Sequence, residues 1–237
     1  MSQNIVVVGG SRGIGLEVVR LRASLGDNVT VLSRTEGQLG ELVDLPGSIV
    51  HQAFDATQDE LEPTVFPEAI SGLVYCPGSI NLRSFHSLKP EQFREDFELN
   101  VVGAIKAVQA ALKPLKASGS GSVILYSTVA VQQGLFAHAS VAASKGALEA
   151  LTRTMAAEFA PAVRVNCLAP ALTETSLTER FFSNPEKAQA LAEKYPMGRT
   201  GKPEDLASLT SFLLNPESSW ITGQVIGVDG GMSTLRR

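Results

Sequence analysis

The chain has 237 residues, of which 44% are hydrophobic and 19% are charged, and its formal net charge is −4 at pH 7. This length and composition fit one well-filled α/β domain and leave no room for a second domain of ordinary size. The slightly acidic balance, without a block of basic residues, argues against nucleic acid or a membrane as the main partner and favours a small-molecule ligand.

The first predicted element is a buried strand that runs into a glycine-rich turn and then into a helix. Ile5–Val8 is apolar without alternation, as in a parallel strand covered on both faces, and Leu16, Val19 and Leu25 follow at helical spacing. Glycines at positions 9, 13 and 15 let the backbone turn tightly and admit a pyrophosphate against its N–H groups. A glycine-rich surface turn is the alternative, but the strand before it and the helix after it favour a dinucleotide-binding loop.

The second apolar run, Val29–Leu32, arrives at the interval expected in such a unit and is followed by Ser33. NAD-selective folds place a carboxylate here, which accepts hydrogen bonds from the ribose 2′-hydroxyl and would repel a 2′-phosphate. This chain has no carboxylate before Glu36, and Arg34 together with Arg12 of the glycine loop is suited to bind a 2′-phosphate. The alternative is that both arginines are ordinary surface charges. The predicted cofactor is NADP(H).

Further apolar runs alternate with helical stretches along the rest of the chain. They are Ser48–Phe54, Leu73–Tyr75, Val123–Tyr126, Val163–Leu168 and Val225–Val228. This alternation predicts a doubly wound Rossmann fold, with a seven-stranded parallel sheet, helices on both faces and right-handed crossovers. No linker interrupts it, so we expect one domain over residues 1–237.

Ligands of a doubly wound sheet bind at the carboxyl ends of the strands, so the residues that follow each strand are candidates for a site. These are Asp55 and Ala56 after the third strand, Cys76 and Gly78 after the fourth, Ser127 and Thr128 after the fifth, and 170–175 after the sixth. A helix from about Pro90 carries Asn100, and a later helix carries Lys145.

The cysteines and histidines favour neither a disulfide nor a metal site. Cys76 and Cys167 each lie at or near the end of an apolar run, as expected of free thiols buried in a reducing cytoplasm. The histidines, His51, His86 and His138, form no ligand-spaced pair, so we expect no metal. Because the chain also shows no signal-peptide pattern and no membrane-length apolar run, we expect a cytoplasmic protein.

Taken in order and at their spacing, the motifs resemble those of the short-chain dehydrogenase/reductase family, in its classical form and most closely its β-ketoacyl carrier-protein reductase-like branch. The resemblance covers nearly the whole chain. It is carried by Gly9–Gly15, Asp55, Gly78, Asn100, Ala142–Lys145, Arg164–Asn166 with Pro170, Pro196–Arg199, Pro203–Asp205 and Trp220–Gly231.

The resemblance implies how a cofactor is held. The glycine loop would lie under the pyrophosphate, Asp55 and Ala56 at the adenine, Asn100 near the nicotinamide ribose, and Lys145 would bond the ribose hydroxyls. The alternatives are a turn role for Asp55 and a helix-interior role for Asn100. The predicted cofactor-binding set is Gly9, Ser11, Arg12, Gly13, Ile14, Gly15, Ser33, Arg34, Asp55, Ala56, Cys76, Gly78, Asn100, Lys145, Pro170, Leu172, Thr173 and Thr175.

The resemblance also implies a catalytic tetrad of Asn, Ser, Tyr and Lys, with the tyrosine four residues before the lysine. Asn100 and Lys145 stand at their positions, Thr128 takes the place of the serine, and Val141 takes the place of the tyrosine. Carbonyl reduction needs a proton at the oxygen, which a phenol beside an ammonium supplies and valine does not. Losing a general acid costs about 10²–10⁴-fold in rate. We therefore expect poor activity on an ordinary ketone unless another group substitutes.

Three substitutes for the missing phenol follow from the sequence. They are His138, one helical turn before Val141, Tyr126 at the end of the fifth strand, and a water held by Thr128 and Lys145. The sequence favours another interpretation for two of them: a strand side chain packed under a helix for Tyr126, and a partly exposed loop residue for His138.

Two functions remain open. The first is an NADP(H)-dependent oxidoreductase whose acceptor needs little acid assistance, such as an imine, a quinone or a conjugated carbonyl. The second is a catalytically weak or inactive cofactor-binding protein that acts as a sensor or a partner subunit. Restoring the tyrosine at position 141 separates them, because it would disturb a working pocket in the first case and create ketone reduction in the second.

The segment from about 176 to 200 follows the sixth strand, where this family places substrate-covering helices. Its apolar residues are Leu177, Phe181, Phe182 and Leu191. They predict either a mobile apolar lid or an amphipathic helix whose apolar stripe packs on the domain core.

The stretch Ala137–Ala160 is rich in alanine and poor in charge, so it allows another helix to approach closely. Relatives form dimers and tetramers through the helix at this place. The resemblance therefore implies a homo-oligomer, a tetramer before a dimer.

Overall fold

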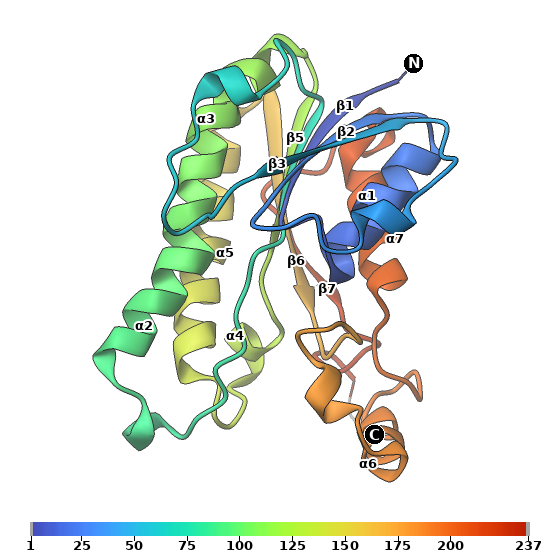
Figure 1. The fold of residues 1–237 in the computed structure, drawn as a ribbon. Coiled ribbons are helices and arrows are strands. Elements are labelled where there is room, and N and C mark those ends of the chain that lie inside the picture. The colour runs from blue at the N-terminus through green and yellow to red at the C-terminus, as the bar shows by residue number, and fades with distance from the viewer. Residues whose placement is uncertain (1, 236–237) are drawn as a thin grey trace.

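The structure of the protein is a computed structural model that describes residues 2–235. Seven strands form one sheet in the order β3-β2-β1-β4-β5-β6-β7, and all neighbouring strands are parallel (Figure 1). Their bounds are β1 Asn4–Val8, β2 Asn28–Ser33, β3 Ser48–Ala53, β4 Gly72–Tyr75, β5 Gly121–Tyr126, β6 Val163–Pro170 and β7 Val225–Val228. The predicted Rossmann sheet is confirmed; the two ends of the predicted domain, residues 1 and 236–237, lie outside the described part.

Helices cover both faces of the sheet. Their bounds are α1 Gly13–Ser24, α2 Pro90–Phe97, α3 Gly103–Ala117, α4 Ala130–Gln133, α5 Ala139–Phe159, α6 Pro185–Ala192 and α7 Pro203–Leu214. In Figure 1, α2, α3 and α5 stand on one side of the sheet and α1 and α7 on the other. Each side has its own apolar core against the sheet.

The first strand shows why its apolar run does not alternate. Val6 and Val8 pack in the core under α3 and α5, whereas Ile5 and Val7 pack in the core under α1 and α7. All four are almost completely buried. A strand in the middle of a two-faced sheet must be apolar on both sides, as the sequence predicted.

Helix α1 starts directly on the glycine loop. A Cβ atom at Gly15 would lie 2.4 Å from the carbonyl oxygen of Gly9, so the close packing of helix against loop requires glycine there. Val19 is fully buried, as predicted. The prediction for Leu25 was wrong: α1 ends at Ser24, and Leu25 follows it with 60% of its side chain exposed, because the chain turns there towards β2.

The predicted long helix from Pro90 contains a wider turn. Residues Glu98–Val102 form a π-helical turn that joins α2 to α3 without a break. The hydroxyl of Tyr75 donates to the carbonyl oxygen of Leu99 at 2.6 Å, and Gly103 leaves room for it, since a Cβ there would lie 2.3 Å from that hydroxyl. The turn directs Asn100 inward, where it is completely buried. Such turns are frequent at functional sites.

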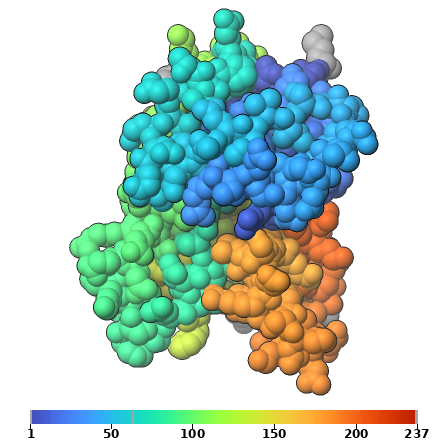
Figure 2. Space-filling view, in the orientation of Figure 1, coloured from blue at the N-terminus to red at the C-terminus, as the bar shows by residue number. Residues whose placement is uncertain are grey.

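The segment after β6 lies against the end of the molecule that carries the carboxyl ends of the strands. Figure 2 shows it in orange, below the blue and cyan N-terminal half and beside the green segment that leads into α2. Arg180 donates to the carbonyl oxygen of Ile80 at 3.4 Å across this boundary. Within residues 2–235, no helix combines the length and the apolar character needed to cross a bilayer.

Candidate active site

Two adjoining cavities open at the carboxyl ends of the strands. The larger, of about 690 Å³, is lined by the glycine loop and the ends of β1 to β4. The smaller, of about 340 Å³, is lined by the residues after β5 and β6, the start of α5 and the segment that follows β6. Ile14, Gly78, Thr175 and Leu177 line both. A molecule in one cavity would therefore touch a molecule in the other.

The structure distributes the predicted cofactor residues over the two cavities. The larger brings together Gly9, Ser11, Arg12, Gly13, Ile14, Gly15, Ser33, Arg34, Asp55, Ala56, Cys76, Gly78 and Thr175. The smaller is lined by Lys145, Pro170, Leu172 and Thr173. Asn100 lies buried behind Gly78, at the junction of the two. The predicted residues thus converge on one continuous site, although they are spread along the chain from Gly9 to Thr175.

The larger cavity suits a dinucleotide. The first turn of α1 carries no acidic residue, so its free N–H groups and positive dipole end face the cavity without a competing carboxylate. Gly9 and Gly13 have positive φ angles, 76° and 56°, which residues with side chains rarely adopt, so this loop conformation favours glycine at both positions. Such a cradle binds phosphate through backbone N–H groups.

Arg12 and Arg34 both line this cavity and both are exposed. The one carboxylate among the lining residues is Asp55, whose pKa lies below its usual value because the hydroxyl and the backbone N–H of Thr57 donate to it, with a smaller contribution from Arg34. The wall of the larger cavity therefore carries two guanidinium groups, Arg12 and Arg34, and one carboxylate, Asp55.

His51 was not predicted to have a role, and the structure places it beside this region. Its Nε2 atom lies 3.0 Å from the carbonyl oxygen of Ser33 and 3.1 Å from the Ser33 hydroxyl oxygen, and that hydroxyl donates to the carbonyl oxygen of Thr35. The imidazole thus supports the end of β2, from which Arg34 projects. Pairing of β2 with β3 in the observed register brings it there.

The predicted catalytic positions Thr128, Val141 and Lys145 all line the smaller cavity. The neighbouring hydroxyl of Ser127 donates to the carboxylate of Glu149 at 2.6 Å, which leaves Thr128 as the threonine or serine with a hydroxyl available at the end of β5. Val141 is 6% exposed, so its isopropyl group forms part of the wall. Burial lowers the pKa of Lys145 from 10.5 to about 8.

Asn100 and Lys145 point their polar atoms to the same place. The Asn100 amide nitrogen donates to the Ser144 hydroxyl at 3.1 Å, and its Oδ1 atom is buried without a partner in the described part of the chain. That oxygen and the Lys145 ammonium each lie 3.6 Å from the position that a Cβ atom on Gly78 would occupy. A free acceptor beside a buried cation can hold a hydroxyl group or a water molecule.

The three predicted substitutes for the missing phenol have different outcomes. Tyr126 points away from the cavity, because its hydroxyl oxygen lies 2.6 Å from that of Thr210 on α7, under the opposite face of the sheet. His138 lines the cavity at the start of α5, with Nδ1 2.7 Å from the carbonyl oxygen of Phe136. The packing interpretation of Tyr126 is therefore confirmed, while His138 and a water near Thr128 stay predictions.

The sequence did not single out Tyr195 as a cavity residue. Tyr195, in the loop after α6, lines the smaller cavity and is 6% exposed. The backbone N–H of Leu172 donates to its hydroxyl oxygen at 3.3 Å. No motif contains it, and only the long-range return of the chain to β6 brings it to the site.

The two cysteines are free thiols, as predicted, but their settings differ. Cys167 is buried within β6, whereas Cys76 is only half-buried and borders the larger cavity. Burial raises the pKa of each thiol to about 12. Neither is a reactive thiolate at neutral pH.

The segment after β6 covers the smaller cavity with Leu177, Phe181 and Leu191. Helix α6 buries none of its side chains in the domain core, so the alternative prediction of an amphipathic helix packed on that core was wrong. Within α6, Leu191 lines the smaller cavity. The mobility of this segment stays a prediction.

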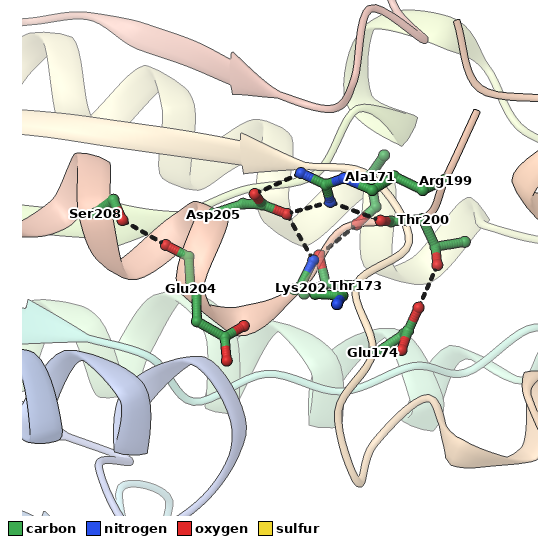
Figure 3. Close-up of polar contacts among 9 residues, drawn as sticks. All are labelled: Ala171, Thr173, Glu174, Arg199, Thr200, Lys202, Glu204, Asp205 and Ser208. Carbon is green, nitrogen blue, oxygen red and sulfur yellow. Dashed lines mark hydrogen bonds and ion pairs between the residues drawn. The ribbon is translucent and has the colours of Figure 1, made fainter. Parts of the chain in front are cut away.

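Polar contacts fix the chain on both sides of this covering segment (Figure 3). Arg199 donates two hydrogen bonds to Asp205, at 2.7 and 2.8 Å, and the Lys202 backbone N–H donates to the same carboxylate at the start of α7. The Thr200 hydroxyl donates to Glu174 at 2.5 Å. The loop before α7 is thereby tied to the residues that follow β6.

Within residues 2–235, no group of three His, Cys, Asp or Glu side chains is arranged to hold a metal ion.

The chain is similar to known proteins over nearly its whole length, which includes the residues that line both cavities. The family model described as enoyl-(acyl carrier protein) reductase matches residues 8–233. A tropinone reductase homolog of Arabidopsis thaliana is 34% identical over 96% of this chain and 91% of its own length. The L-xylulose reductase of Bos taurus is 33% identical over 95% of this chain and 94% of its own. The structure of a short-chain type dehydrogenase/reductase from Mycobacterium ulcerans has a TM-score of 0.91 at 29% identity, covering 100% of this chain and 92% of that one.

Proposed function

The chain belongs to the short-chain dehydrogenase/reductase family, and from this premise we propose that it is an NADP(H)-dependent oxidoreductase that reduces a small, uncharged carbonyl, imine or conjugated acceptor. Its active site is atypical, with Thr128 and Val141 at the usual serine and tyrosine positions. The observation that carries the proposal is the pair of adjoining cavities, one lined by the glycine loop and two arginines and the other mainly apolar, with Lys145 and Asn100 at their junction.

The cofactor half of the proposal assigns a role to each group of lining residues. The N-terminus of α1 and the glycine loop hold the pyrophosphate, Asp55 and Ala56 the adenine, and the residues from Thr173 to Thr175 the carboxamide. Arg12 and Arg34 bind the 2′-phosphate, which charge-assisted contacts from two guanidinium groups favour. When bound, the reduced cofactor supplies a hydride.

The side chains that line the smaller cavity indicate which class of acceptor it can bind. They are mainly aliphatic and aromatic side chains, and no carboxylate or guanidinium is among them. A cationic acceptor would lose its hydration there without gaining an ion pair, and the proposal assigns the Lys145 ammonium in this wall to the reacting atom, so an uncharged acceptor is favoured. Because Val141 offers no proton, acceptors that accept hydride easily, such as quinones, imines and conjugated carbonyls, fit this site better than simple ketones.

Lys145 is the best proton source in this cavity. With a pKa of about 8 its ammonium is largely protonated at neutral pH, yet it gives up a proton far more readily than an ordinary lysine. We assign the proton to Lys145, passed directly or through a water held between it and Thr128. Asn100 Oδ1 orients the ammonium or that water.

The rate should depend on the charge of Lys145. We expect kcat/KM to fall as the pH rises through about 8, because the ammonium is lost there.

Lys145 also affects the stability of the fold. Between pH values of about 8, the pKa of Lys145 in the folded chain, and 10.5, its ordinary pKa, the unfolded chain binds more protons than the folded one. The free-energy cost of burying Lys145 therefore shrinks as the pH rises through this range. A pH–rate profile and thermal unfolding at pH 7 to 10.5 measure both effects. In Lys145→Met both dependences should disappear; their persistence would contradict the assignment.

Calorimetric titration with NADPH and NADH is the direct test of the cofactor proposal, followed by a panel of carbonyls, imines and quinones. We expect NADPH to bind more tightly than NADH and at least one member of the panel to be reduced. A protein that binds NADPH but oxidises it with none of them would favour the alternative, an inactive cofactor-binding sensor or partner subunit. A protein that binds neither nucleotide would contradict both.

The covering segment offers a matched pair of phenylalanines. Phe181 lines the smaller cavity and the adjacent Phe182 does not. Phe181→Ala should raise KM for the acceptor by about tenfold or more, since a lost apolar contact in a pocket costs roughly 1–3 kcal/mol. Phe182→Ala should leave KM unchanged and affect only the melting temperature. Steady-state kinetics of both variants check this, and equal KM values would show that the segment does not contact the acceptor.

We extend the proposal to a homo-oligomer, a tetramer or a dimer. Ala143, Ala150 and Ala157 are exposed on α5 at seven-residue spacing, so they present a smooth stripe against which a second helix can pack closely. A monomer mass by light scattering at micromolar concentration would contradict this.

A further inference from the structure

We propose that Tyr195 binds the reacting oxygen or nitrogen atom of the acceptor: its hydroxyl donates a hydrogen bond into the smaller cavity, in which Val141 offers no donor. The identity of the acceptor rests on the proposed function. The assignment of the residue rests on the geometry of this chain.

The hydroxyl of Tyr195 is held with its proton free. Its oxygen accepts a hydrogen bond from the Leu172 backbone N–H at 3.3 Å, and among residues 2–235 the hydroxyl makes no other hydrogen bond. The ring is buried in the wall of the smaller cavity. A buried hydroxyl with an unused proton needs an acceptor, and the cavity is where one can be placed.

Tyr195 also lies within reach of the predicted catalytic groups. The Val129 backbone N–H donates to the carbonyl oxygen of Pro170 at 3.1 Å, so the residues after β5 run beside those after β6. Thr128 precedes that contact and Leu172, which positions the tyrosine, follows it by two residues. An acceptor in the cavity can therefore contact Tyr195 as well as Lys145 and Thr128, since all three line it.

The tyrosine stands on a fixed part of the chain. Its carbonyl oxygen accepts from the Gly198 backbone N–H at 2.9 Å, and the Gly201 N–H donates to the Leu172 carbonyl oxygen at 3.0 Å. The ion pair of Arg199 with Asp205, seen in Figure 3, holds the loop between these contacts. Donors that are held in place before the substrate arrives stabilise developing charge without reorganisation.

Burial raises the pKa of Tyr195, so the phenol stays protonated at working pH and serves as a hydrogen-bond donor, not as the acid. During reduction of a carbonyl, the carbon gains the hydride and the π-electron pair moves to the oxygen. That oxygen takes a proton from the Lys145 ammonium, which is left neutral. Tyr195 keeps its proton and stabilises the negative charge while it forms.

Tyr195→Phe tests this with Tyr126→Phe as the matched control, because Tyr126 is a buried phenol whose hydroxyl bonds Thr210 away from the cavity. The probe is cyclohexanone bound to the protein with NADP⁺, a pair that cannot react. We expect the carbonyl stretching frequency of the bound ketone to be lowered by hydrogen bonding in the wild-type protein and in Tyr126→Phe. In Tyr195→Phe it should return towards its value in an apolar solvent, with a dissociation constant for the ketone that is about 2- to 10-fold higher.

The affinity for NADP⁺ must be the same in all three proteins, which also shows that the variants fold. An unchanged ketone frequency in Tyr195→Phe would overturn the assignment, and so would an equal loss of NADP⁺ and ketone binding, which would place the tyrosine at the cofactor. If Tyr195→Phe does not fold, Tyr195→His retains a donor and should keep the lowered frequency; a ketone that is not hydrogen-bonded there overturns the proposal.

The same measurements distinguish failure of the oxidoreductase proposal from failure of the Tyr195 assignment. If no nucleotide binds, the oxidoreductase proposal fails, and the frequency of ketone bound to the protein alone decides the role of Tyr195. If NADP⁺ binds but no ketone does, the tyrosine assignment is overturned while the cofactor proposal stands.

Discussion

Replacing Arg34 with alanine is expected to weaken NADPH binding by about 10- to 100-fold and to leave NADH binding unchanged. Arg34 lines the larger cavity at the end of β2, where the chain has no carboxylate before Glu36. A hydrogen bond to a charged group contributes about 1.5–3 kcal/mol, and only NADPH carries the phosphate that would receive it. Because the guanidinium is exposed, the loss should be larger at low salt than at high salt. Calorimetry with both nucleotides at two salt concentrations measures it.

Arg153 is a suitable control, since it is an exposed arginine on α5 that lines neither cavity. Arg153→Ala should bind both nucleotides as the wild-type protein does. An equal loss of NADPH and NADH affinity in Arg34→Ala would place the arginine at a part common to both cofactors. Unchanged affinity for both would mean that Arg34 is an ordinary surface charge.

Val141→Tyr should exchange one activity for another. The new phenol would lie one helical turn from Lys145, whose ammonium lowers the phenol pKa, with Thr128 and Asn100 already in place. We expect the reduction of a small ketone such as cyclohexanone to become about 10²–10⁴-fold faster. The acceptor that the wild-type protein reduces should be reduced more slowly, because the ring takes space from the smaller cavity. Steady-state rates with both substrates measure the exchange.

Val141→Phe separates the two effects, because it adds the ring without the hydroxyl. It should lose the wild-type activity and gain no ketone reduction. If the wild-type protein is inactive and Val141→Tyr alone turns over, the chain is an inactive relative with an intact cofactor site. If Val141→Tyr gains nothing, Thr128, Asn100 and Lys145 are not arranged as a catalytic set.

The sequence predicted the parts of the fold that depend on near neighbours. Ile5–Val8 is predicted as a strand covered on both faces, because burial on both sides requires a continuous apolar run. The glycine loop is predicted to bind a phosphate, because a strand precedes it and a helix follows it. The positions of Thr128, Val141 and Lys145 at one cavity also followed, since all lie at or near the carboxyl end of the sheet.

The sequence did not predict features that depend on contacts between distant segments. Tyr195 reaches the site only because its loop is held against Leu172. The π-helical turn at Asn100 depends on a hydrogen bond from Tyr75, 24 residues before Leu99. The direction of Tyr126 depends on the pairing of its hydroxyl with Thr210 of α7. Periodicity reports which face of an element is apolar, but not which polar partner a distant segment will bring.

The separation of the two cavities bears on how such a protein diverges. Ile14, Gly78, Thr175 and Leu177 line both cavities, and Lys145, Pro170, Leu172 and Thr173 of the smaller cavity also belong to the predicted cofactor-binding set. The other residues of the smaller cavity can change without altering an atom assigned to the nucleotide. Mutations at Val141 or Tyr195 can therefore accumulate under selection for a new substrate while the protein keeps the cofactor proposed for it. In a lineage with this arrangement, substrate specificity can change without a change in cofactor binding.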